Sequence, residues 1–396
     1  MIDAEWVQRL STWFVGNARS LPWRGTVGQP RDPYGALVSE AMLQQTQVSR
    51  VVERFLKFMA RFPTVHSLAA AEVGEVLALW SGMGYYRRAR SLHAAARMVV
   101  ERFGGVVPRE VASLRELPGV GRYTAGAIAS IALGEPAPIV DGNVARVLLR
   151  VYGRAVRPDD RATQPWLWER ATEIAGAGAQ NGPMGAAVGN EALMELGATV
   201  CLPLPATPRC GDCPLASVCI ARRAGKQMQI PLPKAATVRK PVYCASVVMH
   251  GKRGSVLLER RADTGMWAGM WQAPTIERED RFPTRAELAR AVGLRAADLA
   301  PRGIFTHATT HRSIECAVFA TVGTMPLRPL RGEWVSPASI AERGVSSAQQ
   351  RVLRLGSGPI ATAVSDRPGR RGQGERPVPP AARSTPKPTS PRRARP

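Results

Sequence analysis

The stretch that most constrains this chain lies between residues 117 and 146. It begins with Leu117-Pro118-Gly119-Val120-Gly121, a turn in which proline ends one predicted helix and two glycines allow a tight connection to the next. Small residues then let the second helix pack closely. Because Gly119 and Gly121 lack a Cβ atom, their N–H groups can approach a phosphate at the start of a helix. The stretch therefore predicts two helices joined by a hairpin that holds a nucleic-acid backbone.

A carboxylate follows this hairpin within the same stretch, in Val140-Asp141-Gly142-Asn143. One interpretation makes Asp141 the N-cap of a helix over 142–150, where a side-chain oxygen accepts a backbone hydrogen bond. The other makes it functional, because a carboxylate beside a polyanion is repelled and needs a reason to be there. The residues of this segment alone leave both interpretations open.

The charge of the chain favours a polyanionic partner. It has 396 residues, enough for two folded domains, and carries a formal net charge of +23 with a pI near 11.1. Nucleic acid is the leading candidate for that partner. The first residues lack a basic segment followed by an apolar one, and no run approaches the ~18 apolar residues of a membrane helix. We therefore expect a soluble, cytoplasmic protein whose six cysteines are not disulfide-bonded.

Periodic apolar positions predict an all-α domain over residues 1–220. In this domain the pattern is helix, short loop, helix, with no alternation typical of a strand. The expected helices span 4–16, 39–62, 68–80, 88–103, 111–117, 122–133, 142–152, 164–178 and 184–200.

The composition changes after residue 220. Residues 221–240 are basic and contain prolines, which is typical of a linker. A smaller α+β domain is expected over 241–356, with a basic, Pro- and Arg-rich disordered tail over 357–396. In the smaller domain we expect strands over 242–250, 255–259 and 314–322 and a helix over 284–293.

Four cysteines form a cluster near the end of the helical domain. They follow the pattern Cys201-x8-Cys210-x2-Cys213-x5-Cys219, which suits a zinc site or a [4Fe–4S] cluster. The uneven spacing favours the iron–sulfur cluster, because zinc modules usually pair two C-x2-C knuckles. Cys244 and Cys316 lie in predicted strands and are interpreted as small buried side chains.

Together these features resemble the helix-hairpin-helix DNA glycosylase superfamily. Within it, Leu21-Pro22-Trp23-Arg24, the segment SEAMLQQTQV at 39–48 and GMGYY at 82–86 are similar to the MutY-type adenine DNA glycosylases. The resemblance covers residues 6–220. It continues more weakly over 241–350, where GMWAGMW at 265–271 resembles the family's MutT-like domain. The expected fold class is thus an all-α helix-hairpin-helix glycosylase domain with a [4Fe–4S] loop, followed by a smaller Nudix-like α+β domain.

The resemblance implies removal of adenine mispaired with 8-oxoguanine, or with guanine, in double-stranded DNA. Cleavage of an N-glycosidic bond needs an acid for the leaving base and a negative charge beside the sugar, which two carboxylates supply. By resemblance, Glu40 is the general acid and Asp141 stabilises or transiently bonds the sugar C1′, while Asn143 and Tyr123 orient the site. Glu40 needs a raised pKa for this role, which an apolar pocket can produce.

Further residues take roles from the same resemblance. Related endonuclease III-type enzymes carry a lysine where this chain has Tyr123, so we expect a glycosylase without strand-cleaving activity. Two sets of side chains are expected to contact the substrate. Those at the adenine pocket are Leu21, Trp23, Arg24 and Glu191, and those that wedge into the duplex around 8-oxoguanine are Leu43, Gln45 and Tyr85. For Tyr85-Tyr86 the alternative is a pair of core aromatics, although the flanking glycines favour an exposed loop.

The smaller domain departs from the family pattern. Thr309-Thr310-His311 falls where the family recognises 8-oxoguanine through Phe-Ser-His, so the hydroxyl of Thr310 and His311 are kept and the aromatic ring is absent. We find no Nudix box, so lesion recognition is expected instead of nucleotide hydrolysis. The gap between Cys201 and Cys210 is longer than is usual in the family, which predicts altered contacts with the DNA backbone.

Three other functions are each opposed by a feature of the sequence. An endonuclease III-type glycosylase and lyase is opposed by Tyr123 and by the second domain. A catalytically silent lesion sensor is opposed by the presence of both Glu40 and Asp141. An electron-transfer protein is opposed by the single cluster and the strongly basic charge. We expect a monomer in the bacterial cytoplasm that associates with the nucleoid as it acts.

Overall fold

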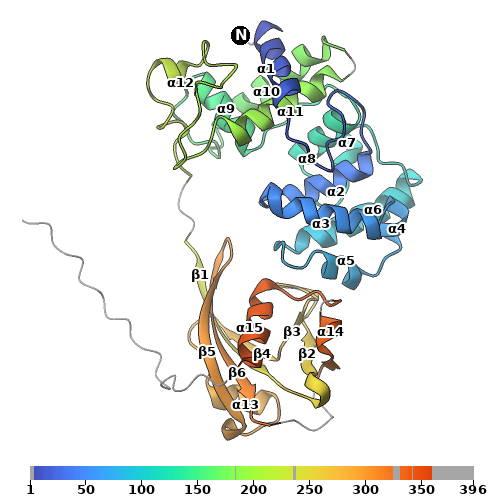
Figure 1. Ribbon diagram of the computed structural model, residues 1–396, viewed down its shortest axis with the longest axis vertical. Helices are drawn as coiled ribbons and strands as arrows, with labels where there is room; N and C mark the ends of the chain where they lie inside the picture. The colour runs from blue at the N-terminus through green and yellow to red at the C-terminus, as the bar shows by residue number, and fades with distance from the viewer. Residues whose placement is uncertain (1–3, 183, 235–237, 324–330, 341, 359–396) are drawn as a thin grey trace, which may run out of the picture.

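The computed structural model describes residues 4–182, 184–234, 238–323, 331–340 and 342–358. Nearly all of the tail expected over 357–396 and part of the expected linker lie outside the described residues. The chain forms a helical part followed by a part that contains all of the described strands (Figure 1). Among the described residues up to 234 there is no strand, in agreement with the all-α expectation.

The helical part consists of short helices that follow one another closely. Their bounds are α1 Ala4–Asn17, α2 Pro33–Leu43, α3 Val48–Arg61, α4 Val65–Ala69, α5 Val73–Leu79, α6 Arg87–Phe103, α7 Val111–Leu114, α8 Arg122–Ala127, α9 Gly142–Val151, α10 Thr163–Ala179, α11 Gly185–Thr199 and α12 Ile220–Arg223. A π-helical turn, Ile128–Ala132, continues α8. Most of these helices begin and end close to the positions that the apolar periodicity predicts, but the helix expected over 68–80 is divided into α4 and α5.

The prediction of one helix over 39–62 is wrong, because the structure divides it into α2 and α3. Helix α2 begins at Pro33, where the Asp32 carboxylate accepts hydrogen bonds from the N–H groups of Tyr34 and Gly35. It ends at Leu43, and Gln45 then adopts a left-handed conformation with φ of 54°. A residue in that conformation cannot continue an α-helix. The break contains neither glycine nor proline, so the sequence carried no ordinary stop signal.

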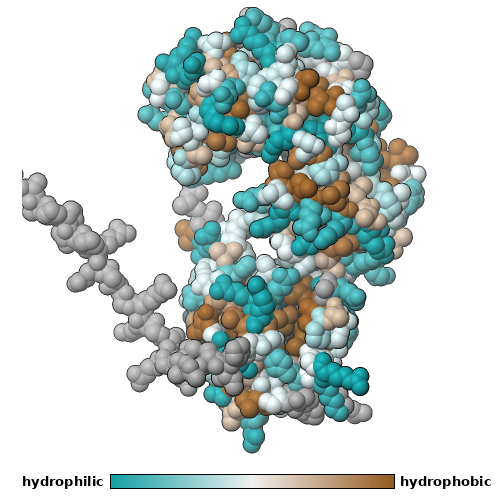
Figure 2. Space-filling model, viewed as in Figure 1, coloured by the Kyte–Doolittle hydropathy of each residue, from teal (hydrophilic) through white to brown (hydrophobic). Residues whose placement is uncertain are grey.

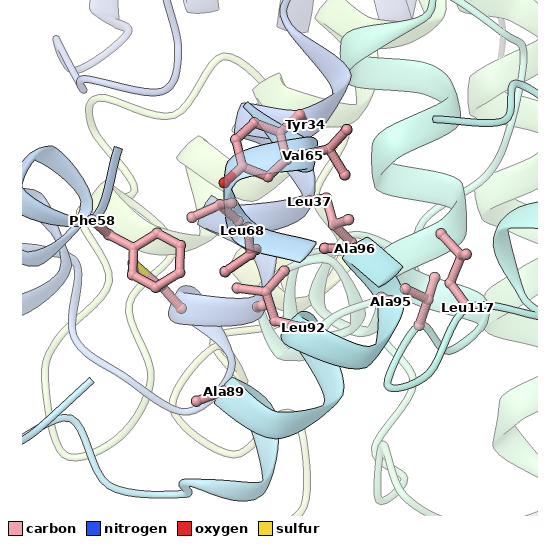
Figure 3. Close-up of a cluster of buried hydrophobic side chains, with 14 of the residues drawn as sticks. Tyr34, Leu37, Phe58, Val65, Leu68, Ala89, Leu92, Ala95, Ala96 and Leu117 are labelled. Carbon is pink, nitrogen blue, oxygen red and sulfur yellow. The ribbon is translucent and has the colours of Figure 1, made fainter. Parts of the chain in front are cut away.

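Two apolar cores divide the helical part into two lobes. The first core lies among α2 to α8 and includes Tyr34, Leu37, Phe58 and Leu92 (Figure 3). The second core is built by α1, α9, α10 and α11. Helix α2 belongs to the first lobe and α11 to the second, and residues of both helices line one cavity. The lobes therefore leave a cleft between them.

The C-terminal domain contains two sheets. The strands are β1 Lys240–Val248, β2 Val256–Arg260, β3 Trp271–Gln272, β4 Thr275–Arg278, β5 Leu299–Ala308, β6 Arg312–Thr321 and β7 Glu333–Val335. The larger sheet has the order β4-β1-β6-β5, with β1 parallel to β6, and the smaller has the order β3-β2-β7. Helix α15, Ser347–Ser357, packs on β1, β6 and β5, and α13, Arg285–Ala291, contacts β1.

The sequence predicted the strands at β1, β2 and β6 and the helix at α13, each close to its observed bounds. It did not predict β5. This strand pairs with β6 along the edge of the sheet, and a register shift lies between Pro301 and Gly303. Only Leu299 and Phe305 of its ten residues are buried. A half-exposed strand with an irregularity lacks the alternation on which such a prediction depends.

The C-terminal domain packs against the first helical lobe. Met270 is buried within the apolar core of that lobe, and Trp267 packs against it. The Ser81 hydroxyl donates to the carbonyl of Val345 (2.9 Å), and Arg90 donates to the carbonyl of Ala268 (2.7 Å). The space-filling view shows the surface hollowed on one side between the helical part and the C-terminal domain (Figure 2).

Candidate active site

The residues predicted to form the adenine site and the catalytic group line a single cavity in the cleft between the two helical lobes. Helix α2 contributes Glu40, α8 contributes Tyr123, and α11 contributes Glu191. The cavity therefore brings together side chains that are far apart in the sequence. The other predicted residues that line it are Leu21, Trp23, Arg24, Leu43, Gln45, Asp141 and Asn143.

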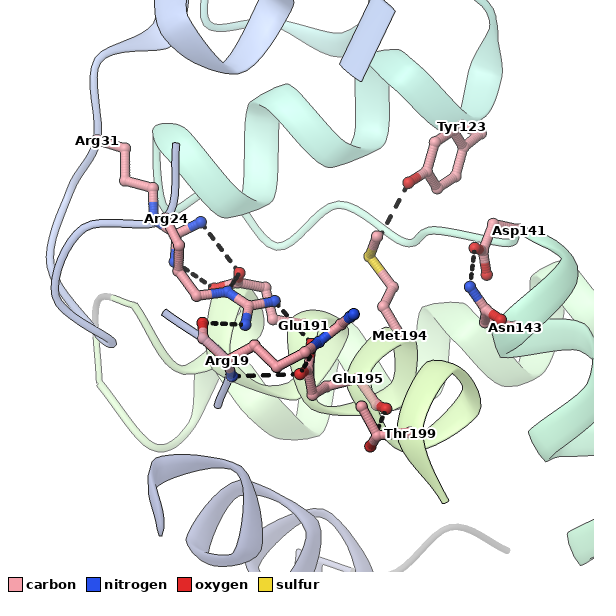
Figure 4. Close-up of polar contacts among 10 residues, drawn as sticks. All are labelled: Arg19, Arg24, Arg31, Tyr123, Asp141, Asn143, Glu191, Met194, Glu195 and Thr199. Carbon is pink, nitrogen blue, oxygen red and sulfur yellow. Dashed lines mark hydrogen bonds and ion pairs between the residues drawn. The ribbon is translucent and has the colours of Figure 1, made fainter. Parts of the chain in front are cut away.

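Asp141 has a structural task at the edge of this cavity. One carboxylate oxygen accepts a hydrogen bond from the Val144 N–H (2.7 Å), and the other accepts one from the Asn143 amide (3.0 Å; Figure 4). Asp141 is thus the N-cap of α9, as one interpretation of the sequence proposed. Burial raises the pKa of Asp141, and the two hydrogen bonds act against that rise. The Asp141 side chain therefore both caps α9 and lines the cavity.

Glu40 is less exposed than the half-buried Asp141, with an exposed fraction of 8%. Burial raises its pKa from 4.5 to about 7. The Tyr123 hydroxyl acts in the opposite direction, and the negative charges of Asp141 and Glu191 add to the rise. At neutral pH a substantial fraction of Glu40 therefore carries a proton that it can donate.

Tyr123 stands between the carboxylates and α11. Its hydroxyl donates to the Met194 sulfur at 3.9 Å (Figure 4). Burial, followed by the charges of Glu40 and Asp141, raises the pKa of Tyr123 well above its ordinary value. The side chain is therefore a neutral phenol that can donate a hydrogen bond. It offers no amine nucleophile.

A network of arginines and glutamates lines part of the cavity (Figure 4). Glu191 accepts hydrogen bonds from Arg24 (3.1 Å) and from both terminal nitrogens of Arg31 (3.0 and 2.5 Å). Glu195 accepts from Arg24 (3.0 Å) and from Arg19 (2.5 and 3.1 Å). Burial raises the pKa of Glu195, but the hydrogen bonds and charges of Arg19 and Arg24 outweigh it and hold that pKa below its usual range.

The sequence analysis assigned no role to Arg19, Arg31 and Glu195. Arg31 lies 160 residues from Glu191 in the chain, and Arg19 lies 176 residues from Glu195. No local motif joins such pairs. The only signal was the pair of glutamates on one helix, Glu191 and Glu195, at a spacing that places them on the same face.

Of the predicted wedge residues, Leu43 and Gln45 line the cavity, whereas Tyr85 does not. Tyr85 is 45% exposed, whereas Tyr86 is 5% exposed and part of the first core. The exposed-loop interpretation is therefore right for Tyr85, and the core interpretation is right for Tyr86. The Tyr85 hydroxyl lies 2.6 Å from the Thr310 hydroxyl of the C-terminal domain. His311 follows Thr310 in the turn between β5 and β6 and is exposed.

The two hairpin glycines have different surroundings. Gly119 has φ of 81°, and a Cβ atom at this position would lie 2.6 Å from the Cβ of Ser91. Both the backbone conformation and the packing on α6 therefore require glycine. Gly121 is the N-cap of α8, and nothing lies within 4 Å of the position that its Cβ would occupy. The backbone of Gly121 is thus open to a ligand.

The four clustered cysteines are free thiols that line a separate cavity beside α9. Within the described ranges, no group of three or more His, Cys, Asp or Glu residues is arranged to hold a metal ion. One terminal nitrogen of Arg150 lies 3.2 Å from the Cys201 sulfur, and the other is buried without a hydrogen-bond partner. A buried cation with an unused donor beside four thiols suits an anionic group held by those thiols.

Comparison with known proteins agrees with both parts of the fold. Residues 38–173 match the model of the HhH-GPD superfamily of base excision DNA repair proteins, and residues 244–355 match that of the NUDIX domain. The adenine DNA glycosylase of Homo sapiens is 35% identical, over 88% of this chain and 73% of the human protein. That of Buchnera aphidicola is 33% identical, over 69% and 74%. The solved structure of a thermostable thymine-DNA glycosylase is 28% identical with a TM-score of 0.48, over 56% of this chain and 96% of that one.

The packing of α11 against the start of α9 predicts a difference between two glycine substitutions. A Cβ atom at Gly197 would lie 2.6 Å from the Cβ of Asn143, so Gly197→Ala must displace that residue. We expect a loss of about 1–3 kcal/mol in the free energy of unfolding, measured with urea. At Gly189 of the same helix the nearest atoms are 3.8 and 3.9 Å away. Gly189→Ala should stabilise by roughly 0.5–1 kcal/mol, and equal stability of the two variants would contradict the account.

Proposed function

The chain belongs to the adenine DNA glycosylase family, and we propose that Glu40 and Asp141 in its cleft remove adenine paired with 8-oxoguanine or guanine. The enzyme is a hydrolase of N-glycosidic bonds that acts on DNA. One observation carries the assignment of the reacting groups. Glu40 and Asp141 line the same cavity, and burial raises the pKa of Glu40 to about 7.

The raised pKa lets Glu40 act as the general acid. A proton passes from Glu40 to N7 of adenine as the bond between N9 and the sugar C1′ breaks, and the bonding electrons leave with the base. The sugar is left as an oxocarbenium-like species, which the negative charge of Asp141 stabilises. Glu40, now ionised, accepts a proton from the water that adds to C1′. The proton balance of Glu40 is thereby restored.

Asn143 and Tyr123 orient this chemistry. The Asn143 amide holds one oxygen of Asp141, and Arg146 in turn donates to the Asn143 side-chain oxygen (2.8 Å). Tyr123 directs a neutral hydroxyl toward the same region. Because it has no amine, it cannot form a Schiff base with the sugar, which supports a glycosylase that leaves the DNA strand intact.

The ionic network supports recognition of adenine in the cavity. Arg24 and Arg31 fix the Glu191 carboxylate, whose oxygens are hydrogen-bond acceptors suited to the amino group of adenine. Leu21 and Trp23 add apolar surface against which a flat base can pack. The loop between α1 and α2 carries Leu21, Trp23, Arg24 and Arg31, and α11 carries Glu191.

The two parts of the fold are proposed to have different functions. We assign catalysis to residues 1–220, lesion recognition to 241–356, and linkage to the basic segment 221–240. The contact between Tyr85 and Thr310 supports a role for both parts around the base opposite adenine, with Leu43 and Gln45 beside it. Thr310 and the exposed His311 supply hydrogen-bonding groups there, while Gly119 and Gly121 contact the DNA backbone.

Cys201, Cys210, Cys213 and Cys219 are proposed to hold one [4Fe–4S] cluster. A bound cluster would cross-link the loop that follows α11 and would balance the charge of Arg146 and Arg150, a structural role. Arg146 donates to the carbonyl of Cys201 (2.8 Å) and also to that of Gly197 (2.7 Å). Through this arginine, the cysteine loop is tied to the helix start that carries Asp141 and Asn143.

The net charge of +23 supports salt-sensitive association with duplex DNA. We propose that the chain acts as a monomer in association with the bacterial nucleoid. Among the described residues, none of the helices combines the length and apolar character needed to span a bilayer.

Single-turnover assays on a duplex with adenine opposite 8-oxoguanine test the proposed reaction. We expect strand cleavage at the adenine only after alkali, because the product is an intact strand with an abasic site. Glu40→Gln and Asp141→Asn should each lower the rate by at least roughly 100-fold, since they remove the acid or the stabilising charge. Cleavage without alkali would indicate a lyase. Tight binding without any product in the wild-type chain would indicate a lesion sensor.

Metal analysis of the purified chain tests the cluster. We expect brown protein with about four iron atoms per chain, and Cys213→Ser should lose iron together with thermal stability. Cys244→Ser in the C-terminal domain is the matched control, because Cys244 is buried in β1 away from the cluster, and its iron content should equal that of the wild type. Colourless protein that contains zinc would overturn the assignment.

A further inference from the structure

Arg88, in the first turn of α6, makes an unusual number of contacts with the end of the helix that carries Glu40. One terminal nitrogen donates to the carbonyls of Ala41 (2.9 Å), Met42 (2.9 Å) and Gln44 (2.5 Å). These carbonyls lie at the C-terminus of α2, where the last groups of a helix lack partners and the helix dipole is negative. Arg88 therefore caps α2 only one turn beyond Glu40.

The second terminal nitrogen of Arg88 contacts the two surface turns beside the cavity. It donates to the Thr46 hydroxyl (3.0 Å) and to the carbonyl of Gly84 (3.3 Å). The guanidinium also lies over the ring of Tyr85, 5.3 Å from its centroid, and over that of Trp80, at 5.4 Å. A single side chain thus joins the turn at 44–46 to the turn at 84–86.

These two turns contain two of the four non-glycine residues with positive φ in the described part of the chain. Gln45 has φ of 54° and Tyr85 has φ of 47°. A side-chain-bearing residue in the left-handed region costs about 1–2 kcal/mol and persists where its surroundings hold it there. Arg88 bonds the residues on both sides of Gln45 and the residue that precedes Tyr85. Among the described residues, no other side chain donates hydrogen bonds to both turns.

The charged guanidinium of Arg88 is used for these hydrogen bonds and ring contacts. In the described part of the chain it forms no ion pair with a carboxylate, unlike Arg24, Arg31 and Arg90. Burial lowers its pKa to about 10, with Tyr85 acting in the opposite direction, so it stays protonated at neutral pH. Its planar fork reaches five oxygen atoms in two directions, which the single nitrogen of a lysine cannot do.

We propose that Arg88 is a positioning residue that holds Gln45 and Tyr85 in their left-handed conformations, ready to enter the duplex, and fixes them relative to the Glu40 helix. The inference rests on the proposed function, because it assumes that Gln45 and Tyr85 enter the duplex around the base opposite adenine. Arg88 acts through these residues and does not itself touch the substrate. Extrusion of a base costs a few kcal/mol, so turns that are already in place favour it.

Three variants separate this role from a general effect on folding. Arg88→Met removes the fork and keeps much of the apolar stem, and Arg88→Lys keeps the charge without the fork. Arg97→Met is the matched control on the same helix, because Arg97 is exposed and pairs only with Glu101 one turn away. Should Arg88→Met fail to fold, Arg88→Lys serves for every comparison below.

Two kinetic readouts test the positioning role. Under single turnover we expect both Arg88 variants to excise adenine on the order of 100-fold more slowly, as for a reacting group held in the wrong place. The fluorescence of a 2-aminopurine placed next to the target adenine reports base extrusion. The rate of extrusion should fall together with the rate of excision. The affinity for undamaged duplex should stay within roughly threefold, because phosphate contacts dominate it. In a Tyr85→Ala background the effect of Arg88→Met should shrink, since the two residues act as a unit.

Hydrogen exchange without DNA provides a readout that is independent of the reaction. The Thr46 N–H bonds to the carbonyl of Leu43 (3.2 Å), so its protection reports the turn at 44–46. We expect faster exchange over 44–46 and 84–86 in both Arg88 variants and wild-type exchange in Arg97→Met. The wild type could fail to excise adenine opposite 8-oxoguanine while exchange over the two turns is still faster in the Arg88 variants. The proposed function would then be wrong, but the role of Arg88 in holding the two turns would be supported. Wild-type exchange or wild-type excision in Arg88→Lys would overturn the proposal.

Discussion

A carboxylate that leaves water loses several kcal/mol of solvation free energy, and four carboxyl groups line one cavity of this protein. Two of these carboxyl groups, Asp141 and Glu40, have different surroundings. Asp141 receives hydrogen bonds from the Val144 N–H and the Asn143 amide, which oppose the rise that burial imposes on its pKa. For Glu40, burial prevails and the pKa rises to about 7. Two carboxyl groups with separated pKa values are what an acid and a charged stabiliser require.

The remaining architecture keeps this pair in place. The cavity lies between two lobes with separate apolar cores, so neither lobe contains the complete site. Arginines pair with the buried glutamates Glu191 and Glu195 and offset part of the negative charge that these add beside the catalytic pair. At the C-terminus of α2, Arg88 supplies the opposing charge and connects the helix of Glu40 to the exposed turns. The C-terminal domain contacts those turns through Thr310.

Much of the site could be predicted from the sequence because short motifs mark it. The segment around Glu40, the hairpin with Gly119 and the capping position of Asp141 are local patterns, and the structure brings all three elements together. The arginine partners are a different case. Arg31 and Glu191 are 160 residues apart, and the sequence around either residue contains no pattern that predicts their pairing. The break at Gln45 was also missed, because a non-glycine residue with φ of 54° depends on contacts from α6. The edge strand β5 was missed for a similar reason. Its register shift is defined by its pairing with β6, which the sequence of β5 alone does not show.

Titration of Glu40 in the DNA-free protein tests the central claim most directly. The infrared difference spectrum between wild type and Glu40→Gln isolates the carboxyl group, and its protonated band can be followed with pH. Because burial favours the neutral acid, the protonated band should persist well above pH 4.5 and be lost as pH rises through about 7. A midpoint near 4.5, the ordinary value for a glutamate, would contradict the account, because Glu40 would then be ionised at neutral pH and could not protonate adenine.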